Sequence, residues 1–124
     1  MSILFPEKPK PVVGANELLF SAVGLAHGHI YGMTHALLNA GATLCEVWDD
    51  SPQKVAAFLK VFPQAKAAPS LEAALGNPAV HLIASAAVPS ERCALGIRAM
   101  LSLFRHFILQ LFVQFFTHNY SPRL

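Results

Sequence analysis

A glycine-containing loop is the part of this sequence whose residue types are best suited to bind a ligand. The loop is Gly24-Leu25-Ala26-His27-Gly28-His29, and it lies between an apolar run and a segment with helical periodicity. A helix N-terminus offers unpaired N–H groups and a positive dipole to a phosphate, and the small residues Gly24, Ala26 and Gly28 let the backbone approach it. The match to G-x-G-x-x-G is imperfect, because Ala26 and His29 take the second and third glycine positions. Taken alone, the loop is also consistent with a plain tight turn.

Asp49 strengthens the interpretation of this loop as a phosphate-binding one. It follows Gly28 by 21 residues and comes directly after the second apolar run. A carboxylate there can accept hydrogen bonds from the 2′- and 3′-hydroxyls of an adenosine ribose, and it would repel a 2′-phosphate. We therefore predict NAD as the cofactor in preference to NADP. Asp50 is adjacent, and the sequence leaves open which carboxylate points toward the ligand; a pair of solvated turn acids is the alternative.

The loop histidines His27 and His29 are expected beside the phosphates of the cofactor, where partial positive charge would favour binding. Together with His35 they could also be read as metal ligands. No nearby acid or cysteine completes a ligand set, however, so no metal is predicted. The chain has no G-x-S-x-G motif and no lysine of a Walker motif after the loop. A serine hydrolase and a P-loop phosphotransferase are therefore disfavoured.

The elements that must position this loop alternate along the chain between about residues 17 and 100. Short apolar runs predict strands at 18–23, 43–48, 65–68 and 80–85. Helical patterns follow at 30–40, 52–62, 70–75 and 90–100. Ser51 and Ser70 are expected as N-caps, and Gly41 as the left-handed residue that ends the first helix.

The apolar faces of the first two helices can be predicted from their spacing. Ile30, Met33 and Leu37 are expected to face the core in the first helix. In the second helix, the expected stripe consists of Val55, Phe58, Leu59 and Phe62.

This alternation predicts an α/β fold with a parallel sheet. Right-handed crossovers give the strand order 3-2-1-4, which is part of a doubly wound, Rossmann-type sheet. We expect a flexible arm at 1–16, where prolines alternate with charges, and a partial dinucleotide-binding domain at 17–100.

Composition limits the classes of protein to which the chain can belong. With 124 residues, 54% of them hydrophobic and 13% charged, it is one globular domain. The net charge of +2 is too small to indicate nucleic-acid binding. Two isolated cysteines, Cys45 and Cys93, indicate neither a disulfide framework nor a zinc site. The first residues lack the apolar core of a signal peptide, so we expect a cytoplasmic protein.

Residues 101–124 differ from the rest of the chain, since they hold five of the nine phenylalanines and no glycine, lysine or acid. We expect an apolar helical tail that covers the open edge of the sheet or self-associates through 101–118. Membrane insertion is disfavoured, because the apolar run is short and carries Arg105 and His106 near its start. Binding at a membrane surface is a further alternative. A frameshift, a splice variant or a gene-model error is a separate hypothesis for the origin of this tail.

The ordered combination of these features resembles the opening of the Gfo/Idh/MocA oxidoreductases. The stretches that carry the resemblance are AVGLAHGHIYGMTHALLNAGATLCEVWDDSPQKVAAFLKVFP and PSLEAALGNPAVHLIASAAVPSERCALGIRAM, within about 18–100. The resemblance implies an NAD(P)-dependent oxidoreductase acting on sugars, polyols or related hydroxy compounds. In that family the loop after the fourth strand passes beside the cofactor, which adds Ser85, Ala87 and Pro89 to the candidate cofactor contacts.

The resemblance ends before the catalytic part of that family. Its members continue into a Glu-Lys-Pro motif whose lysine takes part in proton transfer, whereas this sequence has no lysine after Lys66. Ser90-Glu91-Arg92 also stands where members often carry a histidine. We therefore name no catalytic residue and leave open whether the chain is an enzyme. The prediction is a nucleotide-binding domain that lacks the catalytic half; the alternatives are a non-catalytic binding or self-association module and a non-functional truncated product.

Overall fold

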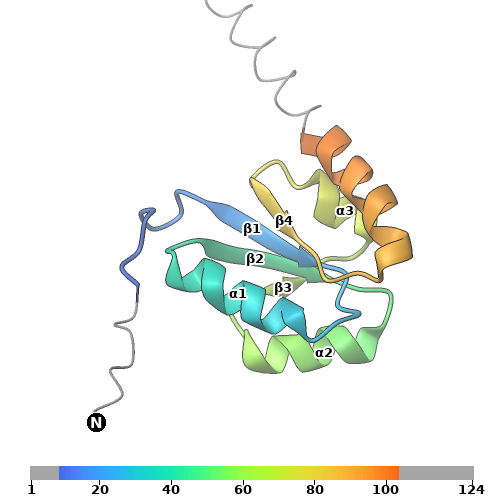
Figure 1. Ribbon diagram of the computed structural model, residues 1–124, viewed down its shortest axis with the longest axis horizontal. Coiled ribbons are helices and arrows are strands. Elements are labelled where there is room, and N and C mark those ends of the chain that lie inside the picture. Colours follow the sequence, from blue (N-terminus) through green and yellow to red (C-terminus); the bar gives the residue numbers. More distant parts are fainter. Residues whose placement is uncertain (1–8, 104–124) are drawn as a thin grey trace, which may run out of the picture.

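The computed structural model describes residues 9–103, which form a parallel sheet with helices on both faces (Figure 1). The strands are β1 (Leu19–Val23), β2 (Thr43–Trp48), β3 (Lys66–Ala67) and β4 (Leu82–Ala84). Their order across the sheet is β3-β2-β1-β4, and every pairing is parallel. The predicted α/β, Rossmann-type fold with strand order 3-2-1-4 is confirmed. The expected apolar tail lies almost entirely outside the described residues.

Three helices follow the first three strands, and a fourth follows β4. They are α1 (His29–Asn39), α2 (Pro52–Val61), α3 (Leu71–Gly76) and a helix that runs from residue 89 to the end of the described part, here called the 89–103 helix. Both predicted N-caps are confirmed: Ser51 Oγ accepts the Lys54 N–H at 3.4 Å, and Ser70 Oγ accepts the Ala73 N–H at 3.0 Å.

The sheet separates two apolar clusters. On one face, Phe20 and Ala22 of β1 pack with Ile30 of α1 and Phe58 of α2. On the other face, Val23 packs with residues of α3 and with Ala99 of the 89–103 helix. The central strand β1 is therefore buried on both sides, as an apolar run in a parallel sheet predicts.

The buried face of α1 differs from the prediction. Ile30 and Thr34 are fully buried, whereas Met33 is 38% exposed. Thr34 can enter the core because its Oγ1 donates to the Ile30 carbonyl at 2.7 Å, which satisfies the hydroxyl within the helix. The expected stripe of α2 is confirmed: Phe58 and Phe62 are buried, and Val55 and Leu59 pack against the same cluster.

The chain before β1 is held against the end of α1. The N–H groups of Val12 and Val13 donate to the Ala40 carbonyl at 2.8 and 3.3 Å. Gly41 has φ +101°, which confirms it as the left-handed residue after α1. Residues 12 and 13 lie within the arm that we expected to be flexible, and these hydrogen bonds place them on the body of the domain. Within the described part of the chain, no helix is long and apolar enough to span a membrane.

Gly41 gives a direct test of this packing. A Cβ on Gly41 would clash with the Val13 carbonyl oxygen, and φ +101° is strained for any L side chain. Gly41→Ala should lower the free energy of unfolding by about 2 kcal/mol or more in urea titrations. Gly32→Ala is the matched control, since nothing lies within 4 Å of an added Cβ there. In the middle of α1 this control should be neutral or should stabilise by about 0.5–1 kcal/mol. Equal stabilities of the two variants would contradict the close packing of Gly41 against the Val13 carbonyl oxygen.

Candidate nucleotide-binding site

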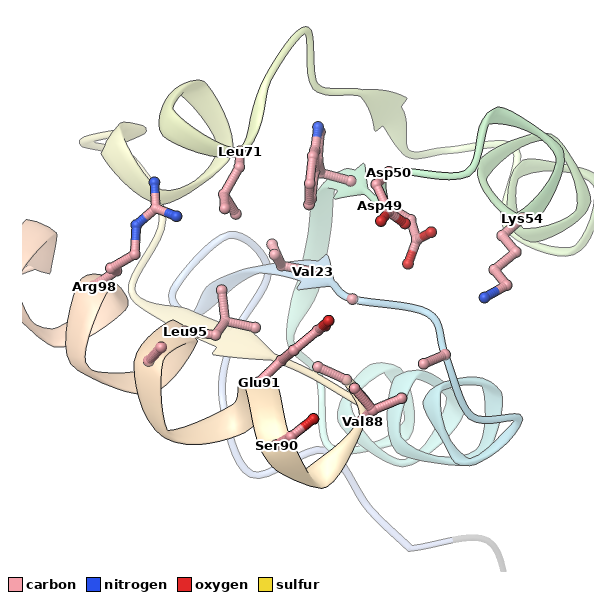
Figure 2. Close-up of a pocket in the computed structure, with 15 residues that line it drawn as sticks. Val23, Asp49, Asp50, Lys54, Leu71, Val88, Ser90, Glu91, Leu95 and Arg98 are labelled. Carbon is pink, nitrogen blue, oxygen red and sulfur yellow. The ribbon is translucent and has the colours of Figure 1, made fainter.

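The carboxyl ends of β1, β2 and β4 meet at a cleft of about 480 Å³. Four of the predicted cofactor contacts line it, Gly24, Ala26, Asp49 and Ala87, and so does the alternative carboxylate, Asp50. Figure 2 shows Asp49 and Asp50 on one side of the cleft, facing Glu91 and Val88 on the other. In open α/β sheets, ligands bind at this edge, at the point where the strand order reverses.

Gly24 is required by the geometry of the loop. Its φ is +84°, and a Cβ there would lie 3.0 Å from Ser85 Oγ and 3.1 Å from Ala87 Cβ. The Ala86 N–H donates to the Gly24 carbonyl at 3.0 Å, and the His27 N–H donates to the Ala86 carbonyl at 3.1 Å. The loop therefore lies directly against the segment after β4. At position 28 the geometry does not require a glycine, because the φ of Gly28 is −59° and nothing lies within 4 Å of an added Cβ.

Asp49 joins the loop to the end of β2. Its Oδ2 accepts the Leu25 N–H at 2.6 Å, and its Oδ1 accepts the Ser51 N–H at 2.9 Å. The carboxylate that points toward the loop is therefore that of Asp49, while Asp50 is exposed at the rim of the cleft. One side chain thus fixes the glycine loop and the start of α2 and also lines the cleft.

The surroundings of Asp49 favour its charged form. Burial alone would raise the pKa of this carboxyl. The backbone donors of Leu25 and Ser51, the Asp50 side chain and the charge of Lys54 outweigh burial and hold the pKa below its usual value of 3.8. Asp49 is consequently an anion at neutral pH.

The far wall of the cleft was not predicted from the sequence. It is formed by Leu71 of α3 and by residues of the 89–103 helix, among them Glu91, Leu95 and Arg98 (Figure 2). Arg98 forms an ion pair with Glu72 of α3, so the two helices are linked at this end of the cleft. No local motif marks these positions, because only the crossover of the chain brings α3 and the 89–103 helix together.

The loop histidines do not line the cleft. His27, Gly28, His29 and Ser85 line a second hollow of about 630 Å³ rather than the cleft. The His29 N–H donates to His27 Nδ1 at 3.1 Å, and the two imidazoles stack with centroids 3.9 Å apart. Pro89 is exposed and lines neither the cleft nor this hollow.

The third histidine of the segment is separate from this pair. His35 packs against Phe62, with ring centroids 4.9 Å apart. Among residues 9–103, no group of three or more histidine, cysteine or acidic side chains is arranged to hold a metal ion.

The fold is shared with a solved structure. A protein from Erwinia carotovora atroseptica SCRI1043, described as a "putative oxidoreductase", is 36% identical to this chain and superposes with a TM-score of 0.67. The fold is oxidoreductase-like. The similarity covers 70% of this chain and 26% of the neighbour, so this chain spans about a quarter of the neighbour's length. No family model and no curated protein matches the chain.

The lowered pKa of Asp49 predicts a pH-dependent contribution to stability. A carboxyl whose pKa is lower in the folded state stabilises the fold above its unfolded-state pKa, and this stabilisation disappears as the pH falls through the folded-state pKa. The difference in unfolding free energy between wild type and Asp49→Asn should therefore be largest near pH 6 and should shrink below about pH 4. Urea unfolding from pH 6 to pH 2.5 measures it. Asp50→Asn is the control, and its difference from wild type in unfolding free energy should be smaller. If the difference between wild type and Asp49→Asn stays the same from pH 6 to pH 2.5, the prediction is wrong.

Proposed function

We propose that this chain binds NAD(H) as the nucleotide-binding part of an oxidoreductase of the Gfo/Idh/MocA type, which acts on sugar or polyol substrates. The motif resemblance within residues 18–100 supports the family. The oxidoreductase-like fold shared with the Erwinia protein supports a dinucleotide cofactor. Because the chain spans about a quarter of that neighbour, the activity of the whole protein is part of the proposal.

The hydrogen bond between Asp49 and Leu25 carries this proposal. It holds the carboxylate at the end of β2 next to the glycine loop, at the border of the cleft. The remaining lone pairs of an ionised carboxylate can accept the two hydroxyls of an adenosine ribose. The loop is then at the right place for the pyrophosphate that follows the ribose.

The charges around the cleft favour NAD over NADP. Three carboxylates line it, namely Asp49, Asp50 and Glu91. Two cations, Lys54 and Arg98, also line the cleft, and Arg98 is already paired with Glu72. A 2′-phosphate next to Asp49 would bring like charges together, whereas a 2′-hydroxyl would be an additional donor.

Backbone amides of the loop provide donors for the pyrophosphate. Within residues 9–103, no acceptor takes the N–H of Ala26 or of Gly28, whereas Leu25, His27 and His29 all donate to protein atoms. Both groups lie just before α1, whose dipole favours an anion there. When bound, NAD(H) supplies the hydride-transfer chemistry, and the residues of this chain bind and orient it.

Binding of the cofactor can be tested with the full chain. NAD⁺ should raise the melting temperature and change the fluorescence of Trp48, the single tryptophan, which lines the cleft. Asp49→Asn should weaken NAD⁺ binding about tenfold or more, because it removes a charged acceptor of hydrogen bonds.

Asp50→Asn is the matched control for this experiment. It removes the same charge from the cleft but leaves the bond to Leu25, so its loss of affinity should be smaller. NADP⁺ should bind more weakly than NAD⁺ to the wild type. If NAD⁺ at millimolar concentration changes neither the melting temperature nor the fluorescence, the proposed function is wrong.

Self-association is a second candidate function, supported by exposed apolar side chains on the 89–103 helix. Ile97, Met100 and Leu101 are 48, 63 and 54% exposed. Apolar residues gathered on one helix favour contact with another chain. Sedimentation velocity without detergent should then show a concentration-dependent dimer or larger species. Weak complexes have dissociation constants in the micromolar range, so about 100 μM protein is enough to reveal them. A monomer at every concentration up to this value would contradict this function.

A further inference from the structure

We propose that residues 107–113 of this chain add a fifth, parallel strand to the open edge of β4 and fill the apolar groove beside it. These residues lie beyond the described part of the chain, whereas the edge and the groove lie within it. The inference goes beyond the proposed function, because it does not depend on whether the chain binds NAD(H).

The outer edge of β4 offers backbone groups to a further strand. β4 is the last strand in the sheet order, so within residues 9–103 its one partner is β1. The His81 N–H donates to the Leu19 carbonyl, on the side of β1. Successive N–H groups of a strand point in alternate directions, so those of Leu82 and Ala84 point away from β1. An edge of this kind is a template for pairing.

An apolar groove of about 620 Å³ flanks this edge. It is lined by β4, by α1 and by the 89–103 helix, and these two helices pack on opposite faces of the sheet. All of its lining residues are apolar except Ser85 and Arg92. Met33 of α1 is one of them and is 38% exposed. A strand in this groove would have a helix on each side, as a strand inside a parallel sheet does.

The crossovers of the fold direct the chain to this edge. α1 and α2 pack on one face of the sheet and carry the chain from β1 outward to β3. α3 packs on the other face and carries it back past β1 to β4. The 89–103 helix follows β4, packs on the same face as α3 and runs back over the sheet (Figure 1). Because crossovers between parallel strands are right-handed, the next position in this direction is the one beyond β4.

The segment that follows has the composition of a buried strand. Residues 107–113 read Phe-Ile-Leu-Gln-Leu-Phe-Val, with no charge and with four aromatic or β-branched residues. A nearly continuous apolar run is typical of a strand that is buried on both faces. Residues 104–106 remain as the connection, and helix-to-strand loops commonly have about 2–6 residues. The sequence alone predicted a helix here; the open edge and the direction of the crossover favour a strand.

The chain's own segment is favoured over that of a second copy. A short connection keeps the segment near the groove at an effective concentration of about millimolar or more. A second copy in a micromolar solution would have to compete with it. The proposal is therefore an intramolecular strand in a monomer.

Amide hydrogen exchange of the full chain, followed by NMR, tests the pairing. The N–H groups of Leu82 and Ala84 should exchange about as slowly as that of Ile83, which points toward β1 and reports an intact sheet. If Leu82 and Ala84 exchange as fast as exposed amides while Ile83 stays protected, the proposal is wrong.

Proline variants distinguish a strand from a helix in the groove. Leu109→Pro and Gln110→Pro are made separately, because one of two successive residues would lose a bond to β4 and the other an outward N–H. One variant should therefore speed the exchange of Leu82 and Ala84 about tenfold or more, and the other much less. Asn119→Pro, beyond the apolar run, is the control and should change nothing. Both prolines would break a helix, so equal effects, or no effect of either, would overturn the proposal.

A variant in the groove tests the proposal without altering the segment. Gly96 lines the groove, and nothing lies within 4 Å of a Cβ added to it. Gly96→Leu should fill part of the groove, displace the segment and speed the exchange of Leu82 and Ala84 about tenfold or more. Cys93→Leu is the control, since Cys93 is exposed on the same helix and lines neither the groove nor the cleft. Exchange in Gly96→Leu equal to that in Cys93→Leu would contradict the proposal.

Protein concentration separates the chain's own segment from that of a second copy. Exchange and sedimentation velocity are measured at about 20 and about 500 μM, on either side of the constants of weak complexes. Protection of Leu82 and Ala84 should be equal at both concentrations and present in the monomer. Protection confined to a dimer would overturn the inference in favour of self-association. Failure of NAD⁺ to bind would refute the proposed function and leave this inference standing.

Discussion

The carboxylate of Asp49 is the interaction on which the candidate site depends. It accepts one backbone N–H from the loop after β1 and one from the start of α2, so three segments meet at one side chain. Each bond is charge-assisted, which makes it stronger than a bond between neutral groups. The same bonds keep the carboxyl ionised, because they favour the charged form more than burial opposes it. Structural support of the loop and a charged position in the cleft wall are thus combined in one residue.

The close approach of the glycine loop to the segment after β4 divides the region around the loop into two parts. Gly24 permits this approach, since a Cβ would meet Ser85 and Ala87. The cleft, with Asp49, Asp50, Glu91, Lys54 and Arg98 in its lining, and the hollow beside His27 and His29 share no residue.

Most of the fold could be predicted from local sequence. The apolar runs and the helix-capping residues Ser51, Ser70 and Gly41 specify where elements begin and end, because caps and turns act through neighbouring backbone groups. Strand order follows from the right-handed crossover rule. The prediction was wrong for Met33, because spacing alone does not show that Thr34 can bury its hydroxyl by bonding to Ile30.

The sequence by itself determined the Rossmann-type fold, the position of the glycine loop after the first strand and the pairing of that loop with an acid at the end of the second strand. Only the tertiary structure decided that Asp49 rather than Asp50 contacts the loop, and that His27 and His29 line another hollow instead of the cleft. It also decided that Leu71 and Arg98 complete the cleft wall. The physical reason is distance along the chain. Local spacing determines which residues form an element, whereas the surroundings of a loop residue depend on segments far along the chain, as with Leu25 and Asp49, which are 24 residues apart.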